Sequence, residues 1–265
     1  MATTWAGRRV LVTGASSGIG AATARELAAA GATVGVCARR GELLDEVLAD
    51  CRRSVSECRA WTIDLTELDA LERFVHDVES ELGGIDVLVN NAGGAIGSAA
   101  LSMPWGDVEY VANLNYLSPV RLTLAALPAM LERGSGQVLT VSSMAARTST
   151  PGEAAYAAAK SALSAFMEAL AAEVWDTGVT FHLVYPGLID LTPGNDGDDA
   201  LADTGQGADR IPAPVLARAM RRQLERGDFE LYMPHSMRDF SQDRARDVAA
   251  SVEFMAGLYQ SGRLH

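Results

Sequence analysis

Lysine is nearly absent from this chain of 265 residues, in which Lys160 is the only lysine and the other 21 of 22 basic residues are arginines. Arginine is a planar, permanently charged fork, whereas lysine is a compact ammonium with three rotatable donors. Lys160 follows Tyr156 by four residues, and a helix would place both side chains on one face. A site that needed only positive charge would use arginine, so we interpret Lys160 as a functional residue rather than a stray lysine on a solvated face.

Other features that the sequence lacks exclude several classes of protein. The sequence has no run of about 18 apolar residues, so no transmembrane helix is expected. Its formal net charge of −12 argues against nucleic acid or an anionic membrane as a partner. The three cysteines (Cys37, Cys51 and Cys58) lack a metal-ligand spacing and cannot all pair with one another. We therefore expect reduced thiols, no metal site and a cytoplasmic location.

Strand-like and helix-like segments alternate along the chain. Seven short apolar segments are predicted as strands: residues 10–12, 33–37, 60–63, 87–89, 138–141, 180–184 and 230–232. Six longer segments are predicted as helices: residues 19–30, 42–51, 67–82, 111–133, 155–176 and 215–226. This alternation predicts an α/β fold with a doubly wound, Rossmann-type parallel sheet of seven strands and helices on both faces. Because there is no internal repeat and no linker, we predict a single domain over residues 1–265.

Two later segments differ from this pattern. Residues 190–209 carry six aspartates and four glycines and no basic residue, which is typical of a surface loop. Residues 238–265 form a tail in which Val248, Val252, Met255 and Leu258 stand near helical spacing, so we predict a helical tail.

A glycine-rich turn follows the first predicted strand. Gly14, Gly18 and Gly20 allow a tight turn, and the helix that begins there offers free N–H groups to a pyrophosphate. The same segment, Gly14-Ala15-Ser16-Ser17-Gly18, matches the nucleophile elbow of serine hydrolases. A hydrolase with Ser16 as nucleophile remains an alternative, although it leaves Tyr156 and Lys160 without a role.

From about residue 9 to residue 186 the sequence resembles the short-chain dehydrogenase/reductase family, in its compact single-domain branch. The motifs that carry the resemblance are Thr13-Gly14-x-x-x-Gly18-Ile19-Gly20, Asn90-Asn91-Ala92-Gly93, Asn115, Ser142-Ser143, Tyr156-x-x-x-Lys160 and Pro186-Gly187. Ser143 lies thirteen residues before Tyr156, and Asn115 lies thirteen residues before Pro128, as in the family. The order and spacing of these pieces make the resemblance specific.

The resemblance implies a catalytic set of Asn115, Ser143, Tyr156 and Lys160. Tyr156 would be the acid in carbonyl reduction and the base in alcohol oxidation. Because a free tyrosine has a pKa near ~10, we expect Lys160 to lower it by favouring the phenolate. Lys160 would also bind the nicotinamide ribose, Ser143 would hold the substrate oxygen, and Asn115 would hold a water behind Lys160.

The second predicted strand ends with Arg39-Arg40 instead of the acidic residue that binds a ribose 2′-hydroxyl. Two guanidiniums suit a 2′-phosphate, so NADP(H) is predicted in preference to NAD(H), with Arg39 more important than Arg40. The alternative is that both arginines cap a helix or face solvent. The cofactor-binding residues that the resemblance and this argument imply are Gly14, Ser16, Ser17, Gly18, Ile19, Gly20, Arg39, Arg40, Asp64, Leu65, Asn91, Ala92, Gly93, Tyr156, Lys160, Pro186, Gly187 and Ile189.

The sequence departs from the family's pattern at two places. Leu191 stands where relatives commonly have a cofactor-binding threonine, and Thr192 follows it. The chain also lacks the Val-Asp-Gly-Gly-like end of many tetrameric relatives. We expect either a homodimer or a homotetramer, with the helices predicted over residues 111–133 and 155–176 at the dimer interface.

We predict an NADP(H)-dependent oxidoreductase that interconverts a small neutral ketone and a secondary alcohol. By resemblance, residues 190–213 would be a substrate lid, whose aspartates would repel anions such as acyl-CoA. A non-catalytic NADP-binding sensor or scaffold remains an alternative, although it predicts a broken catalytic set and all four residues are present.

Overall fold

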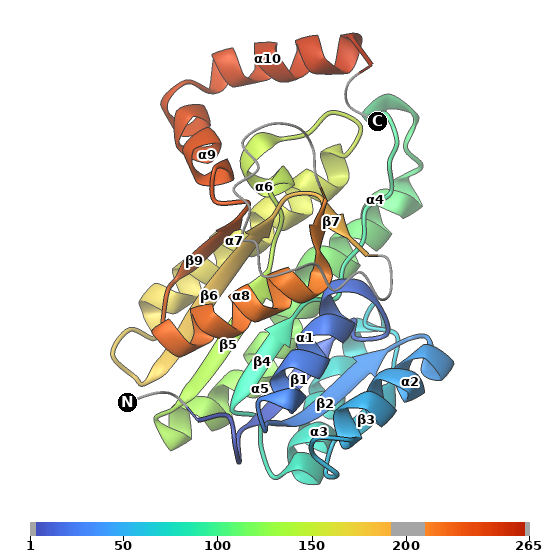
Figure 1. Ribbon diagram of the computed structural model, residues 1–265. Helices are drawn as coiled ribbons and strands as arrows, with labels where there is room; N and C mark the ends of the chain where they lie inside the picture. The colour runs from blue at the N-terminus through green and yellow to red at the C-terminus, as the bar shows by residue number, and fades with distance from the viewer. Residues whose placement is uncertain (1–3, 192–209, 263–265) are drawn as a thin grey trace.

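A seven-stranded parallel sheet forms the centre of the structure, which is a computed structural model describing residues 4–191 and 210–262 (Figure 1). The strand order is β3-β2-β1-β4-β5-β6-β9. The strands are β1 (Arg9–Thr13), β2 (Thr33–Ala38), β3 (Arg59–Thr62), β4 (Val87–Asn90), β5 (Gly136–Val141), β6 (Val179–Pro186) and β9 (Glu230–Met233). Two further short strands, β7 (Ile189–Asp190) and β8 (Ile211–Pro212), pair with each other in parallel.

The predicted doubly wound, Rossmann-type sheet is confirmed. All seven predicted strands are present in parallel register, and each end lies within two residues of the predicted one. The chain builds outward from β1 to β3, then crosses back and builds outward from β4 to β9. Ligands of such sheets bind beyond the carboxyl ends of the strands where the order reverses, here between β1 and β4.

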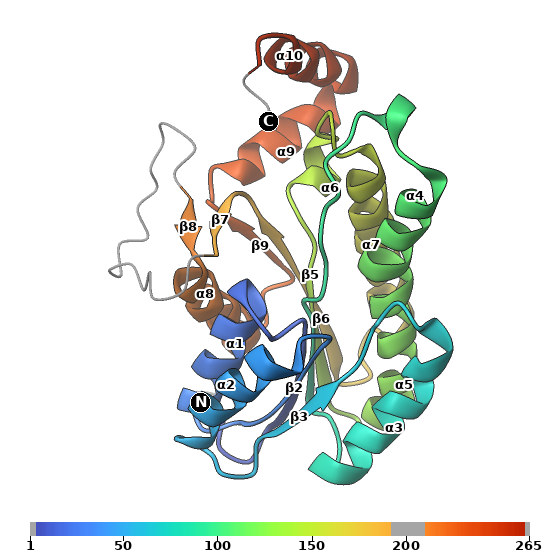
Figure 2. The same cartoon turned by 90° about the vertical axis from the view of Figure 1, so that its right-hand side faces the viewer.

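Helices cover both faces of the sheet. They are α1 (Gly18–Ala29), α2 (Gly41–Arg52), α3 (Leu71–Leu82), α4 (Trp105–Ala112), α5 (Ser118–Arg133), α6 (Ala145–Thr148), α7 (Ala154–Glu173), α8 (Ala213–Arg226), α9 (Met237–Arg246) and α10 (Val248–Gln260), with the short turns η1 (Leu68–Ala70), η2 (Ala100–Ser102) and η3 (Asn113–Leu117). Figure 2 shows α1, α2 and α8 on one side of the sheet and α3, α5 and α7 on the other. Each set of helices packs its apolar side chains against one face, giving two buried clusters.

The helix predicted over residues 111–133 needs the largest correction. It begins earlier, with α4 at Trp105, and a π-helical turn (η3) interrupts it before α5. Pro119 lacks the N–H that would bond to the Asn115 carbonyl in an α-helix. Ser118 instead donates its backbone N–H to the Asn113 carbonyl, five residues earlier. Single π-turns of this kind occur often at functional sites, and this one contains Asn115.

Smaller corrections concern the ends of elements. The predicted helix 67–82 is split into η1 and α3, and the helix predicted to reach residue 176 ends at Glu173. The predicted helical tail consists of two helices, α9 and α10, and neither α6 nor the β7–β8 pair was predicted. Most of the proposed lid, residues 192–209, lies outside the described residues. Within the described part of the chain, no helix has the length and apolar character to cross a membrane.

Candidate active site

The glycine loop lies between β1 and α1, at the reversal point of the sheet. Gly14 and Gly18 have φ angles of +65° and +56°, which L side chains rarely adopt. A Cβ at Gly14 would lie 2.7 Å from the Ala92 Cα atom, and one at Gly20 would lie 2.5 Å from the Gly14 carbonyl oxygen. The positive φ angles and the close approaches together explain why the loop needs glycine at all three positions.

Thr13 joins this loop to the end of β4, a role that the sequence did not reveal. Its Oγ1 accepts backbone N–H bonds from Asn91 (2.9 Å) and Ala92 (3.0 Å) and donates to the Val89 carbonyl (3.2 Å). Asn91 Nδ2 donates to the Thr13 carbonyl at 2.8 Å and to the Gly14 carbonyl at 3.3 Å. The Asn91 side chain therefore supports the glycine loop, in addition to lining the pocket beside it.

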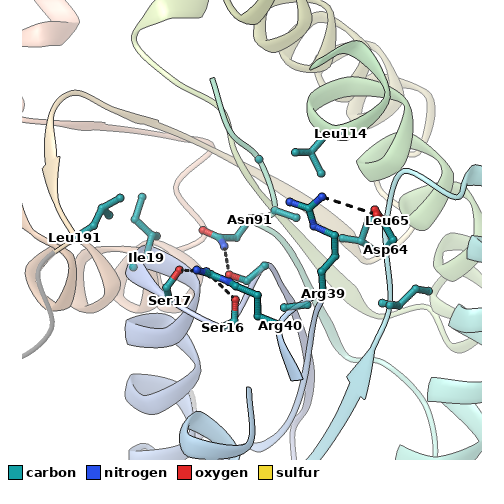
Figure 3. Close-up of a pocket in the computed structure, with 16 residues that line it drawn as sticks. Ser16, Ser17, Ile19, Arg39, Arg40, Asp64, Leu65, Asn91, Leu114 and Leu191 are labelled. Atoms are coloured by element: carbon teal, nitrogen blue, oxygen red, sulfur yellow. Dashed lines mark hydrogen bonds and ion pairs between the residues drawn. The ribbon is translucent and has the colours of Figure 1, made fainter. Parts of the chain in front are cut away.

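A pocket of about 270 Å³ opens above this loop (Figure 3). Twelve of the predicted cofactor-binding residues line it: Gly14, Ser16, Ser17, Gly18, Ile19, Arg39, Arg40, Asp64, Leu65, Asn91, Ala92 and Gly93. Four other residues in the lining were not predicted as contacts: Ala38, Ile63, Leu114 and Leu191. The pocket thus has a glycine-rich floor, two arginines on one wall and a carboxylate nearby.

The two arginines differ in what holds them (Figure 3). Arg40 Nη2 donates to Ser16 Oγ at 3.0 Å and to Ser17 Oγ at 2.6 Å, so it closes over the start of α1. Arg39 is 55% exposed and forms a longer ion pair, 3.8 Å, with Asp64. Both arginines line the pocket, although Arg40 is also the N-cap residue of α2, so the alternative of helix-capping or solvent-facing arginines stays open. A guanidinium donates only, so Arg40 cannot act as the base that a hydrolase built on Ser16 would need.

Asp64 is held as a carboxylate. Burial raises its pKa, but the Thr66 backbone N–H, the Thr66 hydroxyl and Arg39 outweigh burial and lower the pKa overall. Asp64 Oδ1 accepts these two Thr66 bonds at 2.9 and 2.8 Å. An ionised acceptor at the pocket edge is suited to an exocyclic amino group.

Ser143 and Tyr156 meet at the carboxyl end of the sheet. Ser143 is the second residue after β5, and its Oγ accepts the Ala145 backbone N–H at 3.1 Å. Tyr156 lies in the first turn of α7, close enough to Ser143 for the serine side chain to lower the pKa of the phenol against the rise from burial. The neighbouring Ser142 is different, because its hydroxyl is buried and bonded to Ser164 Oγ at 2.8 Å. The structure therefore brings together the predicted Ser143 and Tyr156.

Lys160 lies one turn further along α7 and is 2% exposed. Its Nζ donates to the Val141 carbonyl at 2.8 Å and lies 5.8 Å from the centre of the Tyr156 ring. Asn115 is fully buried in η3, where its Nδ2 donates to the Gly94 and Val111 carbonyls, both at 2.9 Å.

Gly93 shows how closely these two side chains converge. A Cβ at Gly93 would meet Asn115 Oδ1 at 2.7 Å and Lys160 Nζ at 3.1 Å. Since both atoms lie around one point, Asn115 and Lys160 share one side of the Gly93 backbone. Gly93 also lines the glycine-loop pocket, so it connects that pocket with the predicted catalytic side chains.

The titration behaviour of the pair differs from the expectation. Burial raises the pKa of Tyr156; the hydrogen bond from Ser143 opposes this rise and Glu153 adds to it. Burial also lowers the pKa of Lys160 to about 8. The expected lowering of the Tyr156 pKa by Lys160 is therefore not seen, because burial dominates at the phenol and Lys160 is not among the groups that shift it.

Pro186, Gly187 and Ile189, which were also predicted as contacts, are not among the residues that line the pocket. Gly187 follows β6 and donates its N–H to the Met233 carbonyl at 2.8 Å, while the Pro186 carbonyl accepts from Met144 at 3.0 Å. Ile189 is 8% exposed in β7. Leu191 lies over Gly18, where a Cβ would meet its side chain at 2.9 Å. Thr192, the possible additional contact, lies outside the described residues.

Comparison with known proteins places this site in a family. The sequence model of short chain dehydrogenases matches residues 8–200. A short chain dehydrogenase of Pseudocercospora fijiensis is 39% identical over 83% of this chain and 69% of its own. A fatty acyl-CoA reductase of Mycobacterium tuberculosis is 38% identical over 80% of this chain and 71% of its own. The crystal structure of a metagenomic short-chain oxidoreductase in complex with NADP has a TM-score of 0.74 and 30% identity, covering 87% of this chain and 96% of that one.

Proposed function

Because this chain belongs to the short-chain dehydrogenase/reductase family, we propose that it transfers a hydride between NADP(H) and a ketone/secondary alcohol pair, with Tyr156 as the acid and base. The observation that carries the proposal is the convergence of Ser143, Tyr156, Lys160 and Asn115 beside the glycine-loop pocket. A non-catalytic sensor would not need that convergence.

The four side chains divide three chemical tasks among them in this proposal. The cofactor supplies or accepts the hydride. Tyr156 gives its phenolic proton to the carbonyl oxygen, and a raised pKa keeps that proton available at neutral pH. Ser143 donates to the same oxygen as negative charge develops on it. Lys160 and Asn115 form the inner side of the site, from which a proton can be returned to Tyr156.

The pocket wall supports NADP(H) over NAD(H). Arg39 and Arg40 together present guanidinium groups to the pocket, and charge-assisted bonds to phosphate are among the stronger polar contacts. Ser16 and Ser17 orient Arg40. The metagenomic relative in complex with NADP supports the same choice.

For the substrate we propose a small neutral ketone or alcohol, on the basis of six aspartates in residues 190–209 and a net charge of −12. The Mycobacterium tuberculosis relative named as a fatty acyl-CoA reductase favours a second candidate, an acyl-CoA thioester. The two differ strongly in charge. A neutral ketone, a carboxylated analogue and a long-chain acyl-CoA should therefore be compared at low and high salt. Preference for either anion at low salt would reject the neutral substrate.

The proposal is tested by following NADPH oxidation with a panel of ketones, and NADP⁺ reduction with the matching alcohols. Tyr156→Phe should keep NADPH binding and lose turnover by at least about 100-fold, since it removes the acid and little volume. Binding is measured by fluorescence titration. If Tyr156→Phe turned over substrate as fast as the wild type does, Tyr156 would be excluded as the acid.

A further inference from the structure

Arg147 stands at the centre of a polar cluster that the sequence did not indicate. It lies on α6, four residues after Ser143, and its side chain is 26% exposed. Arg147 Nη2 donates to Glu168 Oε1 at 2.7 Å, to Glu230 Oε1 at 3.2 Å and to the Tyr185 hydroxyl. One guanidinium therefore connects α6 to α7, β9 and β6.

The aromatic members make this cluster compact. The Arg147 guanidinium lies 4.5 Å from the centre of the Tyr185 ring, and the Tyr185 and Tyr232 rings are stacked with centroids 4.8 Å apart. Tyr232 in turn donates its hydroxyl to Glu230 at 3.1 Å. Stacking of a guanidinium on an aromatic ring, together with bonds to two carboxylates, fixes an arginine in one orientation.

The helix that carries Arg147 has only four residues. So short a helix is not stable alone and depends on tertiary contacts. It is bonded directly to Ser143, because the Ser143 carbonyl accepts the Ala146 N–H at 3.1 Å and its Oγ accepts from Ala145. A movement of α6 would therefore move Ser143. Figure 1 shows α6 beside α7, and the two are in extensive contact.

We propose that Arg147 is a positioning residue, which clamps α6 to α7, β6 and β9 and so holds Ser143 against Tyr156. This inference rests on the proposed function, because the positioned serine matters only if Ser143 and Tyr156 act on substrate. Arg147 itself acts through Ser143.

Arg221 provides a matched control. It is also 26% exposed and also bonds to two carboxylates, Glu26 and Glu225. It joins α8 to α1 on the opposite face of the sheet, away from Ser143. Loss of either arginine removes a similar ion-pair network, but only Arg147 reaches the catalytic turn.

The first test compares Arg147→Met with Arg221→Met. Arg147→Met should lower kcat roughly 10- to 100-fold, since small misplacement of a catalytic group costs about this much, and should leave the Kd for NADPH within about twofold. Arg221→Met should leave kcat within about twofold. Equal losses of kcat in the two variants would overturn the proposal.

A double-mutant cycle with Ser143→Ala tests the route of the effect. If Arg147 acts through Ser143, Arg147→Met should cost much less in the Ser143→Ala background than in wild type. Full additivity would overturn the proposal. Should Arg147→Met fail to fold, Glu230→Gln keeps the shape of the cluster while weakening the clamp, and the same cycle is then run with it.

Hydrogen exchange gives a readout that needs no activity. Peptides covering residues 143–149 should exchange faster in Arg147→Met than in wild type or Arg221→Met. Unchanged exchange would overturn the clamp whatever the reaction is. A different result would reject the proposed function and leave the clamp intact: the wild type turns over none of the carbonyl compounds, yet residues 143–149 exchange faster in Arg147→Met than in wild type.

Discussion

At the scale of single residues, Lys160 has the most unusual environment. It is 2% exposed, and burial lowers its pKa from 10.5 to about 8. The carbonyl of Val141 satisfies one of its three donors. A buried lysine that loses part of its charge near neutral pH can exchange a proton, which an arginine at the same place could not do.

This environment predicts how stability depends on pH. The unfolded chain regains the ordinary lysine pKa, so between about pH 8 and 10 it binds more protons than the folded protein, and the free energy of unfolding rises with pH. Lys160→Met lacks this contribution. In urea denaturation without cofactor, the stability of wild type relative to Lys160→Met should therefore increase by about 2–3 kcal/mol from pH 7 to pH 10. A difference that does not change with pH would show that folded Lys160 keeps its ordinary pKa.

We also predict that individual residues set the choice of cofactor. The donors of Arg40 are partly occupied by Ser16 and Ser17, whereas Arg39 forms a 3.8 Å ion pair with Asp64 and lies 5.9 Å from the centre of the Tyr110 ring. We therefore expect Arg39→Ala to raise the KM for NADPH more than Arg40→Ala does, by the equivalent of about 1.5–3 kcal/mol in binding free energy. The KM for NADH should be almost unchanged. Steady-state kinetics with both cofactors measure this. Equal losses with NADPH and NADH would make Arg39 a structural residue.

At the scale of secondary-structure elements, the site depends on the loop after β4 and the π-turn η3. The loop brings Gly93 to the point where Asn115 and Lys160 converge. The π-turn places Asn115 there, since it shifts the hydrogen bonding of the helix by one residue. The sequence showed Asn115 and Gly93 as motif residues but gave no sign of this contact.

Gly93→Ala tests that contact, and Gly94→Ala is its control. The added methyl at Gly93 would lie 2.7 Å from Asn115 Oδ1, whereas one at Gly94 would meet nothing within 4 Å. We expect Gly93→Ala to reduce kcat at least about 100-fold, with circular dichroism unchanged, and Gly94→Ala to remain near wild type. Similar activity in both variants would mean that Asn115 and Lys160 tolerate displacement.

At the scale of the whole molecule, η3 with α5 and the tail helix α10 are two of the surfaces that carry exposed apolar side chains. Leu117 and Leu124 are 37% and 47% exposed on η3 and α5. Val252 and Phe254 are 60% and 53% exposed on α10, which packs mainly on α9. The family resemblance leads us to expect the dimer interface at α5 and α7, not at the tail.

Two substitutions separate these surfaces. Leu124→Glu should dissociate the expected dimer into monomers, because it buries a charge in an apolar interface, whereas Val252→Glu should leave the dimer intact. Light scattering coupled to size exclusion gives the mass of each. Dissociation by Val252→Glu alone would move the interface to α10.

The sequence by itself determined the order of the strands and helices, the glycine loop and the pairing of Tyr156 with Lys160. Each of these depends on periodicity or on residues a few positions apart, so local patterns were sufficient. The π-turn was missed because its cause, the absent N–H of Pro119, acts within a segment whose pattern is otherwise helical. The start of α4 at Trp105, directly after Pro104, was missed as well.

The contacts that hold the site residues in place could be found only in the tertiary structure. Thr13 bonds to residues 76 to 79 positions away, and Arg147 reaches Glu230 across 83 positions. The raised pKa of Tyr156 and the lowered pKa of Lys160 likewise arise from burial by several distant elements. Solvation and long-range contacts of this kind have no local sequence pattern, because they exist only once the chain has packed.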